Sequence, residues 1–204
     1  MKDIVLVGAG GHCRSILSVL KLQKSCNVLA IYDHAPRPKE RIDGIAVLHI
    51  DKILGNECRN LFPSIGDNQK RYSIIKSLES FSYSFPSIIS PHAFVDPSAT
   101  IGRGCFIGSF AYIGPHAHIG NFSIINTHAI IEHESKVGSF AHVAPSSVVC
   151  GRTTISDHCF LGANSVVIDN LEIEKNTIIG AGSVVIRSIS TMNSTYVGNP
   201  ASSK

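Results

Sequence analysis

From Val95 onward the chain reads as sixteen consecutive blocks of six residues, and every block opens with Ile, Val or Leu. The second residue is glycine in seven of these blocks, and the fifth is usually small. An amphipathic helix repeats every 3.6 residues and a strand every two, so neither accounts for this period. A period of six is typical of a parallel β-helix, in which each block supplies one short strand and one corner. We expect three blocks to close each coil, with the leading residues inside and the small fifth residues turning the corners.

The segment before the repeat has the pattern of a β-α-β unit. The apolar run Ile4–Val7 ends in a glycine-rich turn that contains Gly10 and Gly11, and a second apolar run, Val28–Tyr32, ends at Asp33. This order is typical of an α/β dinucleotide fold. Between the two runs we expect a helix whose buried side carries Ile16, Leu17, Val19, Leu20 and Leu22.

Two departures argue against an NAD-dependent reaction. Cys13 occupies the position of the third glycine of the dinucleotide motif, and about 85 residues are too few for both halves of that fold. We therefore expect a half-Rossmann-like α/β domain over residues 1–85, an all-β parallel β-helix over 86–190, and a C-terminal tail over 191–204.

A third strand is expected at Leu61–Ile65, followed by Gly66 and a helix from about Gln69 to Leu78 that Asp67 or Asn68 caps. The carboxyl ends of parallel strands lie at one edge of a sheet, where ligands bind. Gly8–His12, Asp33–His34 and Gly66–Asn68 are then expected to converge on a cleft that suits one nucleoside diphosphate. The alternative interpretation is that these residues only form the turns and caps that any α/β domain needs.

Composition narrows the class of partner and the compartment. The formal net charge is +3, only 16% of residues are charged, and no long Lys/Arg run occurs, so nucleic acid and membrane surfaces are not expected partners. The N-terminus does not resemble a signal peptide, and no stretch is long enough for a transmembrane span. Six cysteines without a CxxC pair indicate reduced thiols, so we expect a cytoplasmic protein.

Several aromatic residues of the repeat lie off the inward positions, so parts of the outer surface are expected to be apolar and to need cover. Association of several columns is the expected solution. The residues concerned are Phe94, Phe106, Tyr112, Phe140 and Phe160.

Together the motifs GAGGH, INTHAIIEHESKVGSFAHVAP, IIGAGSVV and VGNPA resemble those of the left-handed hexapeptide acyltransferases. The resemblance covers essentially the whole chain. It is strongest to the two-domain sugar acyltransferases that include bacillosamine-pathway N-acetyltransferases and sialic-acid O-acetyltransferases. It implies a homotrimer with active sites between subunits, acetyl-coenzyme A as acyl donor, no metal, and a nucleotide-linked amino sugar as acceptor.

The same resemblance assigns roles by position. His133 corresponds to the general base, and Glu134 to the group that fixes its ring; this contact requires a corner, because neighbouring residues of an ideal strand face opposite sides. His142, Gly151, Ala163 and Ala181 correspond to the acetyl-coenzyme A site, with the Gly151 N–H expected to polarise the thioester carbonyl. The expected contacts to the nucleotide sugar are Gly10, Gly11, His12, Cys13, Asp33, His34 and Gly66.

Other interpretations of the histidines remain open at this stage. His133 is one of ten histidines and could be a solvated corner residue, as we expect for His116, His118 and His158, which we interpret as surface or trimer-facing. Asn126 and Thr127 are either corner polar groups or part of the acceptor site.

A zinc site is the main rival chemistry. His92, His128 and His133 are 36 and 5 residues apart, a spacing similar to that of the zinc ligands in γ-class carbonic anhydrases, which use the same solenoid with the site between subunits. A third hypothesis is a nucleotide-sugar-binding protein without catalysis. Within the acyltransferase hypothesis, N-acylation of a 4-amino sugar is favoured over O-acylation of a sialic-acid-type sugar, while the nucleotide and the acyl chain length stay open.

Overall fold

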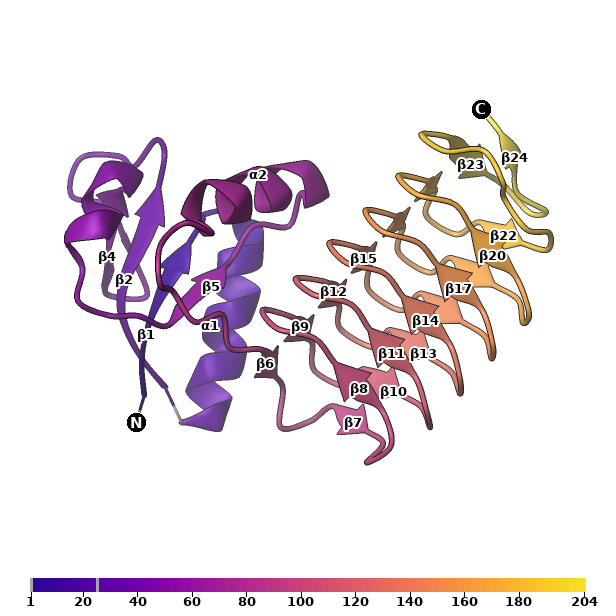
Figure 1. Ribbon diagram of the computed structural model, residues 1–204, viewed down its shortest axis with the longest axis horizontal. Coiled ribbons are helices and arrows are strands. Elements are labelled where there is room, and N and C mark those ends of the chain that lie inside the picture. Colours follow the sequence, from indigo (N-terminus) through magenta and orange to yellow (C-terminus); the bar gives the residue numbers. More distant parts are fainter. Residues whose placement is uncertain (1, 25) are drawn as a thin grey trace.

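An α/β unit and a column of short strands lie side by side in the computed structural model (Figure 1), which describes residues 2–24 and 26–204. The N-terminal sheet has the strand order β3-β4-β2-β1-β5, and all pairs except β3–β4 are parallel. Its strands are β1 (Lys2–Val7), β2 (Cys26–Asp33), β3 (Arg41–Ile42), β4 (Ile45–His49) and β5 (Leu61–Pro63).

The hairpin β3–β4 was missed by the sequence interpretation, although its turn carries a recognisable signal. Asp43 and Gly44 have φ angles of 50° and 82°, as a two-residue hairpin turn requires at both positions. The Asp-Gly pair lies between Ile42 and Ile45, so the flanking residues also fit a hairpin.

In the described part of the chain three helices cover the sheet: α1 (Gly11–Gln23), the 3₁₀ helix η1 (Ile50–Gly55) and α2 (Asn68–Leu78). Asp67 is the N-cap of α2, as predicted, and its carboxylate accepts a hydrogen bond from the Lys70 N–H at 2.8 Å. The prediction for Leu22 was wrong: its side chain is 48% exposed, because it lies on the helix side opposite Ile16 and Leu20. No helix in the described residues is long and apolar enough to cross a membrane.

The repeat forms a left-handed parallel β-helix of two-residue strands arranged in three faces. Figure 1 shows the coils stacked along one axis that leads away from the N-terminal sheet. The covered face contains β6 (Ile88–Ile89), β9 (Phe106–Ile107), β12 (Ile124–Ile125), β15 (His142–Val143), β18 (Phe160–Leu161) and β21 (Ile178–Ile179). The apolar face contains β7 (Phe94–Val95), β10 (Tyr112–Ile113), β13 (Ile130–Ile131), β16 (Val148–Val149), β19 (Val166–Val167) and β22 (Val184–Val185). The polar face contains β8 (Thr100–Ile101), β11 (His118–Ile119), β14 (Lys136–Val137), β17 (Thr154–Ile155) and β20 (Glu172–Ile173).

Strand pairing confirms the predicted coil of 18 residues, since Tyr112 pairs with Ile130 and Ile130 with Val148. The leading residues of the blocks from Ile107 to Val185 point inward and are at most 2% exposed. Each residue of this kind therefore stacks on its equivalents in the coils above and below.

The corners differ from the prediction in one detail. The turn is made by the fourth residue of most blocks, which adopts a left-handed conformation with φ near 60° even where it is Phe, His or Arg. The small fifth residue follows it and is buried inside the corner, where hydroxyls such as that of Ser123 donate to a carbonyl 15 residues further on. Left-handed non-glycine residues are uncommon, so each corner is held by the stacking of its neighbours.

Three columns of corner residues result, and we name them for what surrounds them. The covered corner lies between the polar and covered faces and contains Phe122, Phe140, His158 and Asn176. The stacked corner lies between the covered and apolar faces and contains His92, Phe110, His128, Ser146, Asn164 and Gly182. The open corner lies between the apolar and polar faces and contains His116, Glu134, Arg152 and Asn170.

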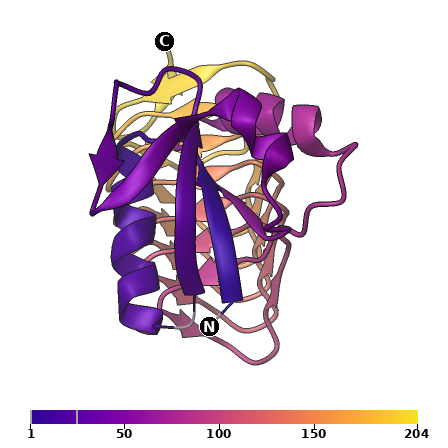
Figure 2. The ribbon, with the colours of Figure 1, turned by 90° about the vertical axis from the view of Figure 1, so that its left-hand side faces the viewer.

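The N-terminal unit itself covers part of the column (Figure 2). Phe106 is buried against α1, and Phe140 is buried among residues of α2. Association of columns is therefore not needed to cover these two rings. The apolar face has no such cover within one chain, and Phe94 there is 52% exposed.

The chain ends by extending the covered face. Strand β23 (Thr195–Val197) pairs with β21, and β24 (Ser202–Ser203) pairs antiparallel with β23. Residues of the expected C-terminal tail thus close the last coil of the column.

Candidate functional site

His133 and Glu134 form a hydrogen-bonded pair on the open corner. Their side chains meet at 3.2 Å between His133 Nδ1 and Glu134 Oε2, because the left-handed Glu134 (φ 58°) supplies the corner that the contact requires. An ionised carboxylate only accepts hydrogen bonds, so it fixes the proton of a neutral ring on Nδ1. The Nε2 lone pair of His133 is then free to accept a proton, and the side chain is 45% exposed.

Gly151 lies directly against this ring, one coil above His133. A Cβ at this position would lie 2.5 Å from both Nε2 and Cε1 of His133. The missing side chain therefore leaves room for the imidazole beside the Gly151 backbone. The Arg152 N–H donates to the His133 carbonyl at 2.9 Å, which ties the two coils together next to the ring.

A cavity of about 930 Å³, the N-terminal cavity, lies at the carboxyl edge of the N-terminal sheet. The predicted convergence of three strand ends is confirmed, because this cavity brings together Gly10, Gly11, His12, Asp33, His34 and Gly66. Gly8 makes the approach of β1 and β5 possible: it has φ 108°, and a Cβ there would lie 2.5 Å from Ile65 Cγ1. The first turn of α1 has no side-chain cap, so its N–H groups are available to a ligand.

Asp33 and Cys13, which are predicted to contact the nucleotide sugar, also have structural roles. The Asp33 carboxylate accepts from the Ala9 N–H at 2.7 Å and from the Ala35 N–H at 3.0 Å, so each of its oxygens already holds a loop. The Cys13 side chain is fully buried in the core beneath the cavity and does not line it. Any contact from Cys13 to a ligand would have to come from its backbone.

His142 lies where the N-terminal unit meets the covered face. Its Nδ1 is 3.1 Å from the Gly66 carbonyl, and its Nε2 is 3.2 Å from Asn126 Nδ2. Since a carbonyl only accepts, the ring proton is on Nδ1 and the Nε2 accepts from the amide. The Asn126 orientation agrees with this, because its Oδ1 accepts from the Thr127 N–H at 2.8 Å.

A smaller cavity, the junction cavity, has a volume of about 390 Å³ and opens beside His142. It shares Gly66, Asp67 and Gln69 with the N-terminal cavity, so the two are contiguous. Its remaining lining comes from Asn68, His142, His158, Phe160, Asn176 and Ile178.

His12 and His142 are both kept neutral by their surroundings. Burial, followed by the nearby His142 and Arg71, lowers the pKa of His12 to about 3. Burial, followed by the charge of Arg71, lowers the pKa of His142 to about 4. The His12 Nε2 is buried without a hydrogen-bond partner among the described residues, which leaves it available to a ligand.

The prediction that His158 is an ordinary surface residue was wrong, because its ring stacks on Phe140 at 5.3 Å and meets the edge of Tyr72 at 5.1 Å. Its αL corner position directs the ring under α2, which sequence spacing alone does not reveal. Burial lowers the pKa of His158.

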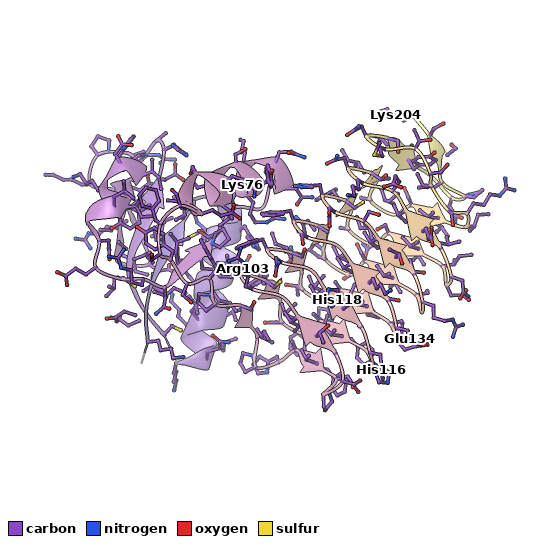
Figure 3. All side chains as sticks on the ribbon, in the orientation of Figure 1. Lys76, Arg103, His116, His118, Glu134 and Lys204 are labelled. Carbon is purple, nitrogen blue, oxygen red and sulfur yellow. The ribbon has the colours of Figure 1, made fainter. Side chains whose placement is uncertain are left out.

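Apart from His142 on the covered face, the candidate residues for the acyl donor are divided between two corners. Ala163 and Ala181 lie one coil apart and directly precede the stacked-corner residues Asn164 and Gly182. Gly151 and His133 belong to the open corner, on the other side of the apolar face. Figure 3 shows Glu134 at the edge of the column, away from Lys76 of α2. One chain therefore does not bring these two groups together.

The three histidines of the zinc hypothesis are also separated, which contradicts a site built from one chain. His92 and His128 are on the stacked corner with the Phe110 ring between them, at centroid distances of 5.6 and 4.9 Å. His133 is on the open corner. Within the described residues, no three His, Cys, Asp or Glu side chains lie close enough together to hold a metal ion.

Arg71 and Lys70 were missed at the sequence level. Arg71 is 1% exposed and donates to carbonyls of the column, and Lys70 lines the N-terminal cavity. The signal for Arg71 was its place in the apolar stripe of α2, three residues before Ile74 and seven before Leu78. A charge in such a stripe indicates a buried polar contact.

Fold and site together define a class: a Rossmann-like α/β domain joined to a left-handed β-helix, with a histidine–carboxylate pair on the column and a cavity at the carboxyl edge of the N-terminal sheet. Residues 3–78 match the family model described as the PglD N-terminal domain, and residues 89–197, more than half of the chain, match the model described as the GMPPB C-terminal domain.

Solved structures agree with this class. PerB from Caulobacter crescentus, in complex with CoA and GDP-perosamine, is 29% identical and has a TM-score of 0.93, with 100% of this chain and 98% of that chain covered. The acetyltransferase domain of PglB from Neisseria gonorrhoeae, in complex with acetyl coenzyme A, is 23% identical with a TM-score of 0.91, and 100% and 99% of the two chains are covered. WeeI from Acinetobacter baumannii is 20% identical, with a TM-score of 0.79 and full coverage of both chains, 100% and 100%. No curated protein matches the chain.

The column belongs to the family of the GMPPB C-terminal domain, and the whole chain belongs to the hexapeptide-repeat sugar acyltransferases. It is an acyltransferase.

Proposed function

We propose that this protein is an acetyl-CoA-dependent N-acetyltransferase that acts on the 4-amino group of a nucleotide-linked sugar in the cytoplasm. The observation that carries the proposal is the His133–Glu134 pair, with a free Nε2 held against the backbone of Gly151. The relatives support the donor and the acceptor class, since PerB was solved with CoA and GDP-perosamine. Two further structures of the perosamine N-acetyltransferase are of mutants in which one histidine was replaced.

The chemistry needs only the proton transfer that His133 is oriented to perform. The neutral amine attacks the thioester carbonyl while His133 Nε2 takes its proton, and Glu134 stabilises the imidazolium that forms. The C–S bond then breaks, and His133 returns the proton to the departing thiolate, which leaves as free coenzyme A. The Gly151 N–H is proposed to stabilise the negative charge on the carbonyl oxygen between these steps.

We assign the nucleotide diphosphate to the N-terminal cavity. The uncapped N-terminus of α1 offers N–H groups and a partial positive charge to a phosphate. Lys70 lines the same cavity and adds a full positive charge, and His12 offers an unpaired ring nitrogen. In this assignment the domain of residues 1–85 holds the acceptor, and the column of residues 86–190 holds the donor.

A homotrimer supplies the complete site. His133 and the N-terminal cavity are on different sides of the column, so the acceptor of one chain reaches the His133 of a neighbour. The apolar face between the two relevant corners is the proposed contact surface, because its outward residues Tyr112, Ile130, Val148, Val166 and Val184 form an apolar strip without cover in one chain. Acetyl-CoA would lie in the groove where the open corner of one column meets the stacked corner of the next.

The direct test is thiol release from acetyl-CoA in the presence of UDP-, GDP- and CMP-linked sugars that carry either a 4-amino or a 4-hydroxyl group. We expect turnover with one nucleotide-linked 4-amino sugar only. Turnover of the hydroxyl compound or of a sialic-acid-type sugar would identify an O-acetyltransferase instead. Binding of a nucleotide sugar without any thiol release would identify a non-catalytic binding protein.

His133→Ala is expected to reduce turnover by roughly 10²- to 10⁴-fold without changing assembly, because the side chain is half exposed and its main role is proton transfer. Mixed trimers test the shared site. His133→Ala and Gly11→Trp, which fills the N-terminal cavity, are each expected to be inactive but to recover part of the activity when reassembled together. No recovery in verified mixed trimers would place both groups in one chain and contradict the shared site.

A further inference from the structure

At the junction of the two units, all three guanidinium nitrogens of Arg71 donate hydrogen bonds. Its side chain is 1% exposed, and its hydrogen-bond partners contain no carboxylate. Nε donates to the Phe122 carbonyl at 2.8 Å, and Nη2 donates to the Phe140 carbonyl at 3.0 Å and to Asn68 Oδ1 at 2.8 Å. These contacts tie α2 to two successive coils of the covered corner.

The remaining donor of Arg71 holds the loop that lines both cavities. Nη1 donates to the Ile65 carbonyl at 2.9 Å and to the Gly66 carbonyl at 3.1 Å. The Gly66 carbonyl also accepts from His142 Nδ1 at 3.1 Å. One carbonyl oxygen is thus shared by a buried guanidinium and a buried imidazole, so the position of Gly66 determines the orientation of the His142 ring.

The connection continues across the covered face to the stacked corner. His142 Nε2 accepts from Asn126 Nδ2, and Asn126 Oδ1 accepts from the Thr127 N–H. These hydrogen bonds fix the donor and acceptor roles of His142 and Asn126, in a network that is part-buried at His142 and exposed at Thr127. The charge of Arg71 also opposes protonation of His142, which agrees with the neutral ring that the two hydrogen bonds require.

We propose that Arg71 is a positioning residue for His142: by fixing the Gly66 carbonyl, it holds the His142 imidazole in one orientation and in the Nδ1-protonated tautomer beside the junction cavity. The link to acyl transfer rests on the proposed function, whereas the link from Arg71 to the His142 tautomer does not. Lysine cannot replace the arginine here, because one ammonium group has three donors on a single atom and cannot reach acceptors on three segments.

The first test reads the tautomer directly. In ¹⁵N spectra of the imidazole rings at neutral pH, we expect the wild-type His142 to show a protonated Nδ1 and an unprotonated Nε2, with the signals assigned by their loss in His142→Phe. Arg71→Lys is expected to convert this to an averaged mixture of both tautomers. An unchanged His142 spectrum in folded Arg71→Lys would overturn the proposal.

Arg103→Lys is the matched control. Arg103 is at the same junction, with its guanidinium 5.2 Å from the Phe122 ring and 5.7 Å from the Phe85 ring, but it has no contact with Gly66. We expect this variant to keep the wild-type His142 tautomer. A shift of the same size in both variants would show that any disturbance of the junction suffices, and it would also overturn the proposal.

The second test is kinetic. Misplacing a group of the site by about 1 Å can cost about 100-fold, so we expect Arg71→Lys to lower kcat by about tenfold to 100-fold, while Arg103→Lys changes it less than about twofold. Equal kcat values for the two variants would contradict a role in transfer. Absence of turnover even in the wild type would instead refute the proposed function and leave the tautomer result intact.

If Arg71→Lys does not fold, the same coupling is read from the other end. His142→Phe keeps the bulk of the ring but removes the hydrogen bond to Gly66. Coupling between two groups is reciprocal, so we expect faster solvent exchange of the Arg71 guanidinium protons in this variant. Unchanged exchange would contradict the proposed connection.

Discussion

The covered corner and the open corner are built on the same left-handed turn, with the same 18-residue spacing, yet they hold opposite contents. Phe140 and His158 of the covered corner have φ angles of 57° and 61°, and Glu134 and Arg152 of the open corner have 58° and 55°. On the covered corner the rings of Phe122, Phe140 and His158 stack in a continuous series under α2. On the open corner the side chains are polar, and the ion pairs of Glu134 are solvent-exposed.

The difference shows that the β-helix fixes where a corner points but not what it does. A corner that another element covers needs hydrogen-bond partners for its buried polar groups, and here Arg71 and Asn68 provide donors to carbonyls of the Phe122, Phe140 and His158 coils. Among the described residues, the His158 Nδ1 is an exception, since it is buried without a partner. A corner left in water can keep a proton acceptor free, as His133 does. Stability is therefore expected to depend on the first corner and catalysis on the second.

Phe140→Ala is expected to have the largest effect on stability. The ring is buried between Phe122, His158 and Tyr72, so its removal leaves a cavity that costs about 3–5 kcal/mol of the free energy of unfolding. His116→Ala, at an equivalent left-handed position of the open corner, is expected to change the free energy of unfolding by less than about 0.5 kcal/mol. Urea unfolding measures the free energy of unfolding of both variants. Equal losses would show that the two corners do not differ in their contribution to stability.

Acid should destabilise the protein where the N-terminal unit meets the covered face, because His12 and His142 lie there. The pKa values of His12 and His142 are lowered to about 3 and about 4 in the folded state, from 6.5, so the unfolded chain binds more protons below neutrality. Their contribution is complete above pH 6.5 and is lost as the pH falls from there through about 4 and then 3, on the order of a few kcal/mol in total.

The measurement is the thermal midpoint as a function of pH. We expect a decline between pH 6.5 and 4 in the wild type and a flatter curve in the double variant His12→Asn, His142→Asn. A double variant with the wild-type slope would show that other groups cause the acid sensitivity.

Two glycines of the column, Gly151 and Gly162, should separate activity from stability. The three atoms nearest to a Cβ on Gly151 would all belong to the His133 ring, so Gly151→Ala is expected to displace the ring and cost about 100-fold in kcat with little change in unfolding. A Cβ on Gly162 would lie 2.5 Å from the Ala181 backbone N, so Gly162→Ala should cost about 1–3 kcal/mol of stability. Turnover assays and urea unfolding of both variants test whether one loses activity and the other stability. A fully active Gly151→Ala would contradict the position of the His133 ring.

Arg152→Met should have the smallest effect. Its guanidinium is 3.8 Å from Glu134 and both side chains are more than half exposed, so the ion pair is worth less than about 1 kcal/mol and is screened by salt. We expect a small loss in the free energy of unfolding at low salt and none at high salt. A loss in the free energy of unfolding that persists at high salt would mean that the open corner also contributes to stability.

Much of the architecture followed from periodicity. The six-residue repeat indicated the β-helix, the 18-residue coil and the inward residues, because a parallel column stacks each residue on its equivalent. The glycine-rich turn and the polar strand ends indicated the N-terminal cavity, since parallel strands share one carboxyl edge. The His133–Glu134 contact was also within reach of the sequence, because it required only a corner at a known place in the block.

What the sequence left open depends on contacts between the two units, which no local pattern encodes. The repeat could not tell which face α1 and α2 would cover, so His158 was placed at the surface and Phe106 and Phe140 were assigned to an interface between columns. Nor could it show that Arg71 would be buried against carbonyls of three segments, or that Gly66 would join it to His142. A repeating chain determines its own column through equivalent neighbours 18 residues away, but the partners of its outer surface are chosen only when a non-repeating domain packs on one side of it.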